Sequence, residues 1–223
     1  MSSALPSLFF EEFASPAQKK RLKILETLLQ ITIRDGLGEL SLVKIARESK
    51  IPKSLIIYHF PDLREAQLYL FKFVARSGVE LTLRNLQGVS TPQGHLEMIA
   101  SSAFEWALKN PDYARYFLLM HHFASVDTRF ARIHQESIET GSKRLAMYLE
   151  EVLKRKLPKA DLLLQGKILH SVLSMTIVKM VASGDFENFK DYVRMVEVAF
   201  SKFIGKDILL VIPLEGRLPG RSD

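Results

Sequence analysis

The chain has 223 residues, of which 47% are hydrophobic and 25% charged, and this composition excludes wholesale disorder. It contains no cysteine, so disulfides, cysteine-ligated metals, iron–sulfur clusters and cysteine nucleophiles are excluded. No apolar run approaches the ~18 residues of a membrane-spanning helix. Residues 1–13 lack the basic start of a signal peptide. We therefore expect a cytoplasmic protein with no membrane partner.

The positive charge is concentrated in the first third of the chain. Residues 17–76 hold twelve Lys or Arg against six Asp or Glu, a surplus equal to the formal net charge of +6 for the whole chain. A basic segment joined to a neutral remainder is typical of a polyanion-binding module attached to a second unit. A merely solvated basic face is the alternative.

The first elements are predicted to be one long helix followed by two short ones. Residues 17–34 place apolar side chains at steps of three and four, the spacing of an amphipathic helix, and Gly36 is suited to end it. Ser41 is the expected N-cap of a short helix over 42–49. A second short helix is expected over 52–59 after a three-residue turn, with its proline in the first turn.

The rest of the chain is also predicted to be helical. Asp62 and Glu65 form an acidic variant of the capping box, which opens a long helix. Helices are expected at about 63–87, 93–109, 111–124, 127–156, 161–183 and 187–204. Residues 207–214 are expected to form an extended arm packed on the body, and 216–223 a frayed end. The fold class is therefore all-α, with about nine helices.

Two short helices inside a basic segment suggest a helix-turn-helix, whose second helix enters the DNA major groove. Lys53, Ser54 and Leu55 stand near the start of that second helix, where base edges are reached. Tyr58 and His59 stand at its end, where the sugar-phosphate backbone passes.

These residues also carry a family resemblance. The run GLGELSLVKIARESKIPKSLIIYHFPDLREAQL, preceded by RLKILETLLQIT, resembles the N-terminal domain of TetR-family transcriptional regulators. The resemblance covers about residues 17–72, which we assign as the DNA-binding domain. Residues 73–205 would then form a helical ligand-binding and dimerisation domain, and 206–223 a tail. The candidate DNA contacts are Ser41, Lys44, Lys53, Ser54, Leu55, Tyr58, His59 and Arg64.

The sequence departs from the family pattern at five positions. Lys50 stands where the family usually has Gly in the turn, and Pro52 replaces the usual Ser or Thr cap. Leu55 and Ile57 occupy positions that are often polar or Tyr. Leu63 replaces the usual Lys at the start of the fourth helix. These changes put the identity of the DNA site in question.

The resemblance implies a homodimer formed by the last two helices, at about 161–183 and 187–204. It also implies a cavity for a small-molecule effector and a palindromic operator on double-stranded DNA that the effector releases. An apolar or amphiphilic ligand is expected, with His121, Glu105 or His170 as polar anchor. The candidate ligand contacts are Phe104, Glu105, Phe117, Met120, His121, Tyr148 and His170, with plain core packing as the alternative for each.

No cofactor, metal site or enzymatic activity is expected. Adjacent residues on a helix point about 100° apart, so His121 and His122 are poorly placed to grip one metal. Glycine-rich phosphate loops, a nucleophile-elbow serine and HExxH are absent from the sequence. Two functions stay open: a TetR-like regulator, most simply a repressor, and a ligand-sequestering protein of the same fold with a degenerate DNA-binding head.

Overall fold

The computed structural model describes residues 15–154 and 157–213. Within these ranges the chain forms nine α-helices and one short 3₁₀ helix, η2 (Leu37–Glu39), without a strand. The α-helices are α1 (Pro16–Asp35), α2 (Leu42–Ser49), α3 (Lys53–His59), α4 (Leu63–Asn85), α5 (Pro92–Lys109), α6 (Pro111–Val126), α7 (Thr128–Leu153), α8 (Lys159–Ser183) and α9 (Phe189–Ile204). The all-α prediction is confirmed, and each predicted helix is present.

Local chemistry sets the ends of the first helices. Gly36, with φ of 82°, ends α1, and the Ser41 hydroxyl accepts a hydrogen bond from the Lys44 amide at 3.1 Å to cap α2. The Asp62 carboxylate caps α4 by accepting from the Glu65 amide at 2.7 Å. Helix α3 begins at Lys53, one residue later than predicted, because Pro52 is its N-cap with an extended ψ of 138°.

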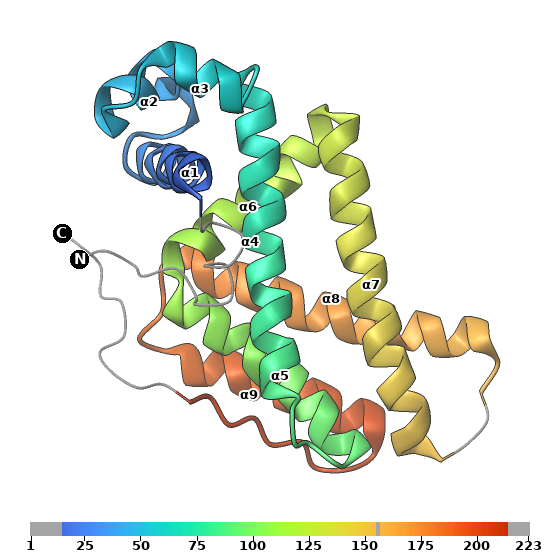
Figure 1. Ribbon diagram of the computed structural model, residues 1–223. Coiled ribbons are helices and arrows are strands. Elements are labelled where there is room, and N and C mark those ends of the chain that lie inside the picture. Colours follow the sequence, from blue (N-terminus) through green and yellow to red (C-terminus); the bar gives the residue numbers. More distant parts are fainter. Residues whose placement is uncertain (1–14, 155–156, 214–223) are drawn as a thin grey trace.

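The buried side chains form two clusters, and Trp106 of α5 packs against both. One cluster joins α1 to α4 with α6 and the start of α7, and the other joins α5 to α9. In Figure 1, α1, α2 and α3 project at one end of α4, while α5 to α9 lie along the rest of it, with α5 and α9 near its other end and the turn between α6 and α7 beside its start. We call the first group the head and the second the body. Helix α4 contributes buried residues to the first cluster, and its Ser77 hydroxyl accepts a hydrogen bond from Trp106 of α5, so it connects the head to the body.

Aromatic side chains join the head to the body. Phe71 on α4 is fully buried and its ring lies 4.6 Å from Tyr116, 5.5 Å from Phe123 and 5.3 Å from Phe130, measured between centroids. The Tyr116 hydroxyl donates to the Gln67 carbonyl at 3.2 Å. Helix α6 therefore packs into the core of the head although it is separated from it by α5.

Close packing of α7 on α8 depends on a glycine. A Cβ at Gly166 would lie 2.4 Å from the Ser142 carbonyl oxygen and 2.8 Å from the Ala146 Cβ. Only a residue without a side chain lets the two backbones approach this far.

The predicted extended arm is confirmed over its described residues. Ile208 and Leu210 are buried, and the Glu197 carboxylate accepts from the Leu210 amide at 2.9 Å. Leu214 and the predicted frayed end at 216–223 lie outside the described residues. In the described parts of the chain, no helix is both long and apolar enough to cross a membrane.

Candidate DNA-binding surface and effector cavity

One side of helix α3 packs against the core of the head, and the other side faces solvent. Ile56 and Phe60 are buried in the core of the head, beside Ile45 of α2. Lys53 and Ser54 are exposed, and Tyr58 is 80% exposed. The short helix is therefore anchored by its apolar side while its polar first turn faces solvent, as the helix-turn-helix interpretation requires.

The turn between α2 and α3 contains an unusual backbone conformation. Lys50 has φ of 57° and ψ of 31°, in the left-handed region. This region costs a residue with a side chain roughly 1–2 kcal/mol, whereas glycine enters it freely. The structure thus gives a physical reason why glycine suits this position, which lysine occupies here.

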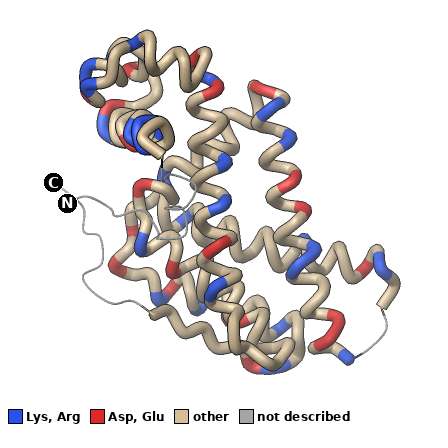
Figure 2. The backbone as a smooth tube through the Cα atoms, in the orientation of Figure 1, with Lys and Arg blue, Asp and Glu red and all other residues tan. Residues whose placement is uncertain are grey.

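Unpaired cations surround this turn. Arg47, Lys50 and Lys53 are exposed, and none has a hydrogen-bond or ion-pair partner in the described residues. Figure 2 shows Lys and Arg gathered along α1 and around α2 and α3. A surface of free cations is suited to a polyanion, because its binding to phosphates would release counterions.

Two of the predicted DNA contacts already have structural roles in the head. The Ser41 hydroxyl caps α2, and the Lys44 ammonium lies 3.0 Å from Asp35 and 3.3 Å from Glu39. Hydrogen bonds from Arg34 and then Lys44 hold the pKa of the Asp35 carboxyl well below its usual range. Lys44 is therefore less available to a phosphate than the free cations of the turn.

Arg64 and His59 are half-buried. The Arg64 guanidinium lies 3.3 Å from Asp127 and stacks over Phe123 at 4.9 Å, so it ties the start of α4 to the turn between α6 and α7. Burial, followed by the nearby charges of Arg21 and Lys20, lowers the pKa of His59. Its Nε2 atom is buried without a hydrogen-bond partner.

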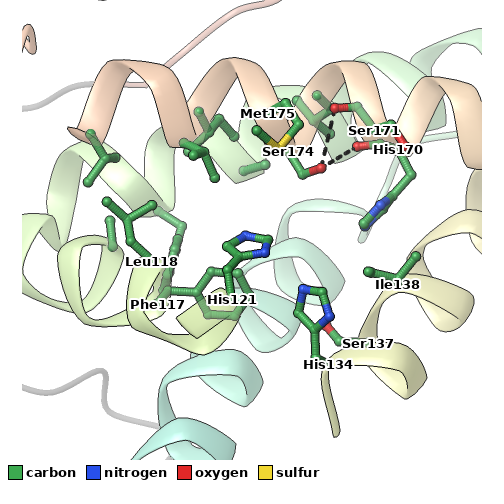
Figure 3. Close-up of a pocket in the computed structure, with 17 residues that line it drawn as sticks. Phe117, Leu118, His121, His134, Ser137, Ile138, His170, Ser171, Ser174 and Met175 are labelled. Carbon is green, nitrogen blue, oxygen red and sulfur yellow. Dashed lines mark hydrogen bonds between the residues drawn. The ribbon is translucent and has the colours of Figure 1, made fainter. Parts of the chain in front are cut away.

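The body contains a cavity of about 290 Å³ between α5, α6, α7 and α8. Figure 3 shows His121 from α6, His134 from α7 and His170 from α8 directed toward the same space. The ring centroids of His121 and His134 are 4.8 Å apart. A Cβ at Gly141 would lie 2.5 Å from the His170 ring, so this glycine provides the room that the imidazole occupies.

Of the seven predicted ligand contacts, three line this cavity: Phe117, His121 and His170. The other four lie elsewhere. Phe104 and Met120 are fully buried in the two cores, and Tyr148 stacks on His95 with centroids 4.3 Å apart. Glu105 accepts from Lys109 and from Asn85, each at 2.7 Å, and joins α5 to α4.

The sequence interpretation missed several lining residues. They are His134, Ser137, Ile138, Ser171, Ser174 and Met175, together with the small residues that make room for them. On α8 the spacing of His170, Ser171 and Ser174 marks one helical face, which is a usable signal. Nothing local relates His134 to the other histidines, because they meet only through the packing of α6, α7 and α8.

The polar groups of the cavity are imidazoles and hydroxyls. Among the described residues its lining includes no Asp, Glu, Lys or Arg. Burial lowers the pKa of His134 and of His170, and a neighbouring histidine adds to each shift. No group of three or more His, Asp or Glu side chains in the described ranges could hold a metal ion. The arrangement can enclose an apolar molecule and offer it imidazole and hydroxyl hydrogen bonds.

Comparisons with known proteins agree with this architecture. No protein-family model matches the sequence, and no curated protein matches it either. A TetR transcription regulator from Haloarcula marismortui ATCC 43049 superposes with a TM-score of 0.71 at 13% identity, covering 86% of this chain and 99% of that one. A TetR-like transcriptional regulator from Rhodococcus sp. RHA1 gives 0.66 at 16% identity, covering 84% and 97%.

The chain has the TetR fold. The superpositions include head and body, so the TetR fold extends far beyond residues 17–72, where the sequence resemblance lies. A further structure with this fold, from Saccharomonospora viridis, was solved in complex with choline. It has a TM-score of 0.65 at 15% identity and covers 74% of this chain and 86% of that one.

Proposed function

We propose that the protein is a DNA-binding transcriptional regulator that acts in the cytoplasm. The observation that carries this proposal is α3, which is anchored by buried Ile56 and Phe60 and presents Lys53, Ser54 and Tyr58 to solvent. The TetR fold and the free cations beside α3 support the same function. Lys53 and Ser54 would contact base edges, while Tyr58, Arg47 and Lys50 would contact phosphates.

The regulator acts as a homodimer in this proposal. Apolar side chains are exposed along α8 and α9, where a soluble monomer would carry polar ones. They are Leu164, Ile168, Met175, Met195, Val198 and Phe203. Pairing α8 and α9 with a second copy would cover them in a four-helix interface. Two symmetric heads would then read a palindromic operator with half-sites about one helical turn apart.

A small apolar or amphiphilic effector would release the operator, which makes the protein a repressor. The cavity supports this part, since its walls are apolar with imidazole and hydroxyl groups. Choline is a cation, and the structure that holds it is one of the matches to this fold. The described lining of the present cavity has no carboxylate to pair with a cation, which favours a different effector here.

One observation favours a second candidate, a ligand-sequestering protein whose head no longer reads DNA. Ile57 is 43% exposed on the outer side of α3, and Leu55 is half-buried beside it. Apolar side chains read few base edges, although a leucine can contact a thymine methyl group. The two candidates differ in whether the purified dimer selects a DNA sequence.

Selection from a random-sequence duplex library, followed by anisotropy titration at several salt concentrations, tests the regulator. We expect a palindromic consensus bound with a steep salt dependence. Lys53→Ala and Lys44→Ala remove one positive charge each and form a matched pair. Lys53→Ala should weaken the affinity for the consensus duplex about tenfold and change the sequence preference of the protein. Lys44→Ala should weaken this affinity less.

The outcome of selection separates the candidates. A library without enrichment, together with tight effector binding, would establish the sequestering protein and overturn the regulator. Equal losses for Lys53→Ala and Lys44→Ala on every sequence would show that α3 contributes only charge. Sedimentation measures the dimer, and Ile168→Glu should give monomers that keep the helical circular dichroism signal.

A further inference from the structure

The cavity continues into a cleft on the surface between α4 and α7. A second pocket of about 190 Å³ shares Trp106, Phe117 and Leu173 with the cavity and reaches Arg144. The cleft, of about 370 Å³, begins where that pocket ends. Ser137 and His170 line all three spaces, so they mark the point where the cavity, the second pocket and the cleft join.

The two ends of this passage differ in charge. The cavity end has no charged lining residue among those described, whereas the cleft is lined by Lys72, Arg76 and Arg144 and by one carboxylate, Glu136. Arg76 is paired with Glu80 at 2.8 Å. Lys72 and Arg144 have no hydrogen-bond or ion-pair partner within the described chain, although Arg144 is half-buried. A half-buried guanidinium without a partner favours an anion beside it.

We propose that the effector is an amphiphilic monoanion, a carboxylate on an apolar body. Its body lies in the cavity beneath Trp106 and Phe117, and its carboxylate lies in the cleft between Arg144 and Lys72. This inference rests on the proposed function and adds the charge and the orientation of its effector. The apolar walls supply most of the affinity, and the cations decide which head group is accepted.

Three probes with the same alkyl chain test the charge of the head group: decanoate, decanol and decyltrimethylammonium. Binding is measured by calorimetry and by the fluorescence of Trp106, the single tryptophan of the chain, which lines the cavity. We expect decanoate to bind about tenfold more tightly than decanol, a difference of about 1.4 kcal/mol. The ammonium probe should bind most weakly. The affinities of octanoate and dodecanoate then show how long an alkyl chain the cavity accepts.

Arg144→Gln separates the head group from the body of the ligand. It should weaken the affinity for decanoate about tenfold and leave the affinity for decanol unchanged. Lys72→Gln should have the same effect to a smaller degree. Lys143→Gln is the control, because Lys143 lies on the same helix, is 65% exposed in its side chain, and neither it nor its ion-pair partner Glu139 lines the passage. It should leave both probes unchanged.

Several results would overturn the inference. They are equal binding of decanoate and decanol, tightest binding of the ammonium probe, an equal effect of Arg144→Gln on both probes, or no binding by any alkanoate. The consensus duplex then separates this inference from the proposed function. Decanoate that binds as expected without releasing the duplex contradicts the repressor alone. Release of the duplex by decanol or by the ammonium probe at a concentration no higher than decanoate requires contradicts the anionic effector and leaves the repressor in place.

Discussion

The head and the body handle polar groups in opposite ways. In the head, short helices anchored by a few buried residues leave Arg47, Lys50 and Lys53 free in solvent. In the body, long helices bring His121, His134 and His170 together around a space whose described lining holds no Asp, Glu, Lys or Arg. The exposed cations of the head suit the binding of a polyanion at the surface. The cavity of the body suits an apolar molecule that is transferred from water into it. The difference shows how one chain can present two chemically distinct surfaces, connected by α4.

The largest expected effect comes from removing the aromatic contact that joins the two regions. Phe71→Ala deletes a fully buried ring between α4, α6 and α7 and should lower the free energy of unfolding by about 3–5 kcal/mol. Urea unfolding measures this loss. Leu83→Ala, at a half-exposed position of the same helix, is the control and should cost much less. A small loss for Phe71→Ala would show that head and body are not joined through this ring.

A smaller effect tests the close packing within the body. Gly166→Ala places a Cβ 2.4 Å from a carbonyl oxygen and should cost about 1–3 kcal/mol in unfolding free energy. Gly78→Ala is the matched helical control, because its Cβ would meet Trp106 at an ordinary 3.5 Å. That variant should gain roughly 0.5–1 kcal/mol from helix propensity. Equal effects at both glycines would contradict the packing between α7 and α8.

The pH dependence of stability tests the neutral character of the cavity. The pKa of His134 and His170 is lowered in the folded state, so below about pH 6.5 the unfolded chain binds more protons than the folded one. The contribution of these histidines to the free energy of unfolding should be fully present above their pKa in the unfolded chain. It should be lost as the pH falls from there toward their lower pKa in the folded protein. Denaturant titrations between pH 8 and pH 5 measure this slope.

Paired substitutions identify the source of that slope. The double variant His134→Asn/His170→Asn should flatten it, while a remainder is expected from His59, whose pKa is also lowered. His122→Asn, at an exposed position outside the cavity, is the control. An unchanged slope in the double variant would show that the two cavity histidines are not held neutral by burial.

The smallest effect is expected at the turn of the head. Lys50→Gly and Lys50→Ala both remove the charge, but only glycine relieves the left-handed backbone. Lys50→Gly should therefore be more stable than Lys50→Ala by about 1 kcal/mol. Thermal unfolding compares the two variants. Equal stabilities would mean that the turn relaxes when lysine is replaced.

Much of the head could be predicted because its signals are local. Ser41, Asp62 and Gly36 mark helix ends, and their caps depend on residues only a few positions away. The apolar spacing of α1 indicates which side is buried without any knowledge of the partner. What the sequence did not reveal in the head is that Lys44 is engaged by Asp35 and Glu39, since this depends on the angle between α1 and α2.

The sequence by itself determined that this chain is all-α, where its helices lie to within a few residues, and that its positive charge gathers in the first third. Each of these follows from periodicity, capping or composition, which act over a few neighbouring residues. Only the tertiary structure decided which side chains share the cavity, because His121, His134 and His170 come from three helices and meet through close packing that Gly141 and Gly166 permit. Such contacts depend on the geometry of the whole bundle, and no local pattern encodes them.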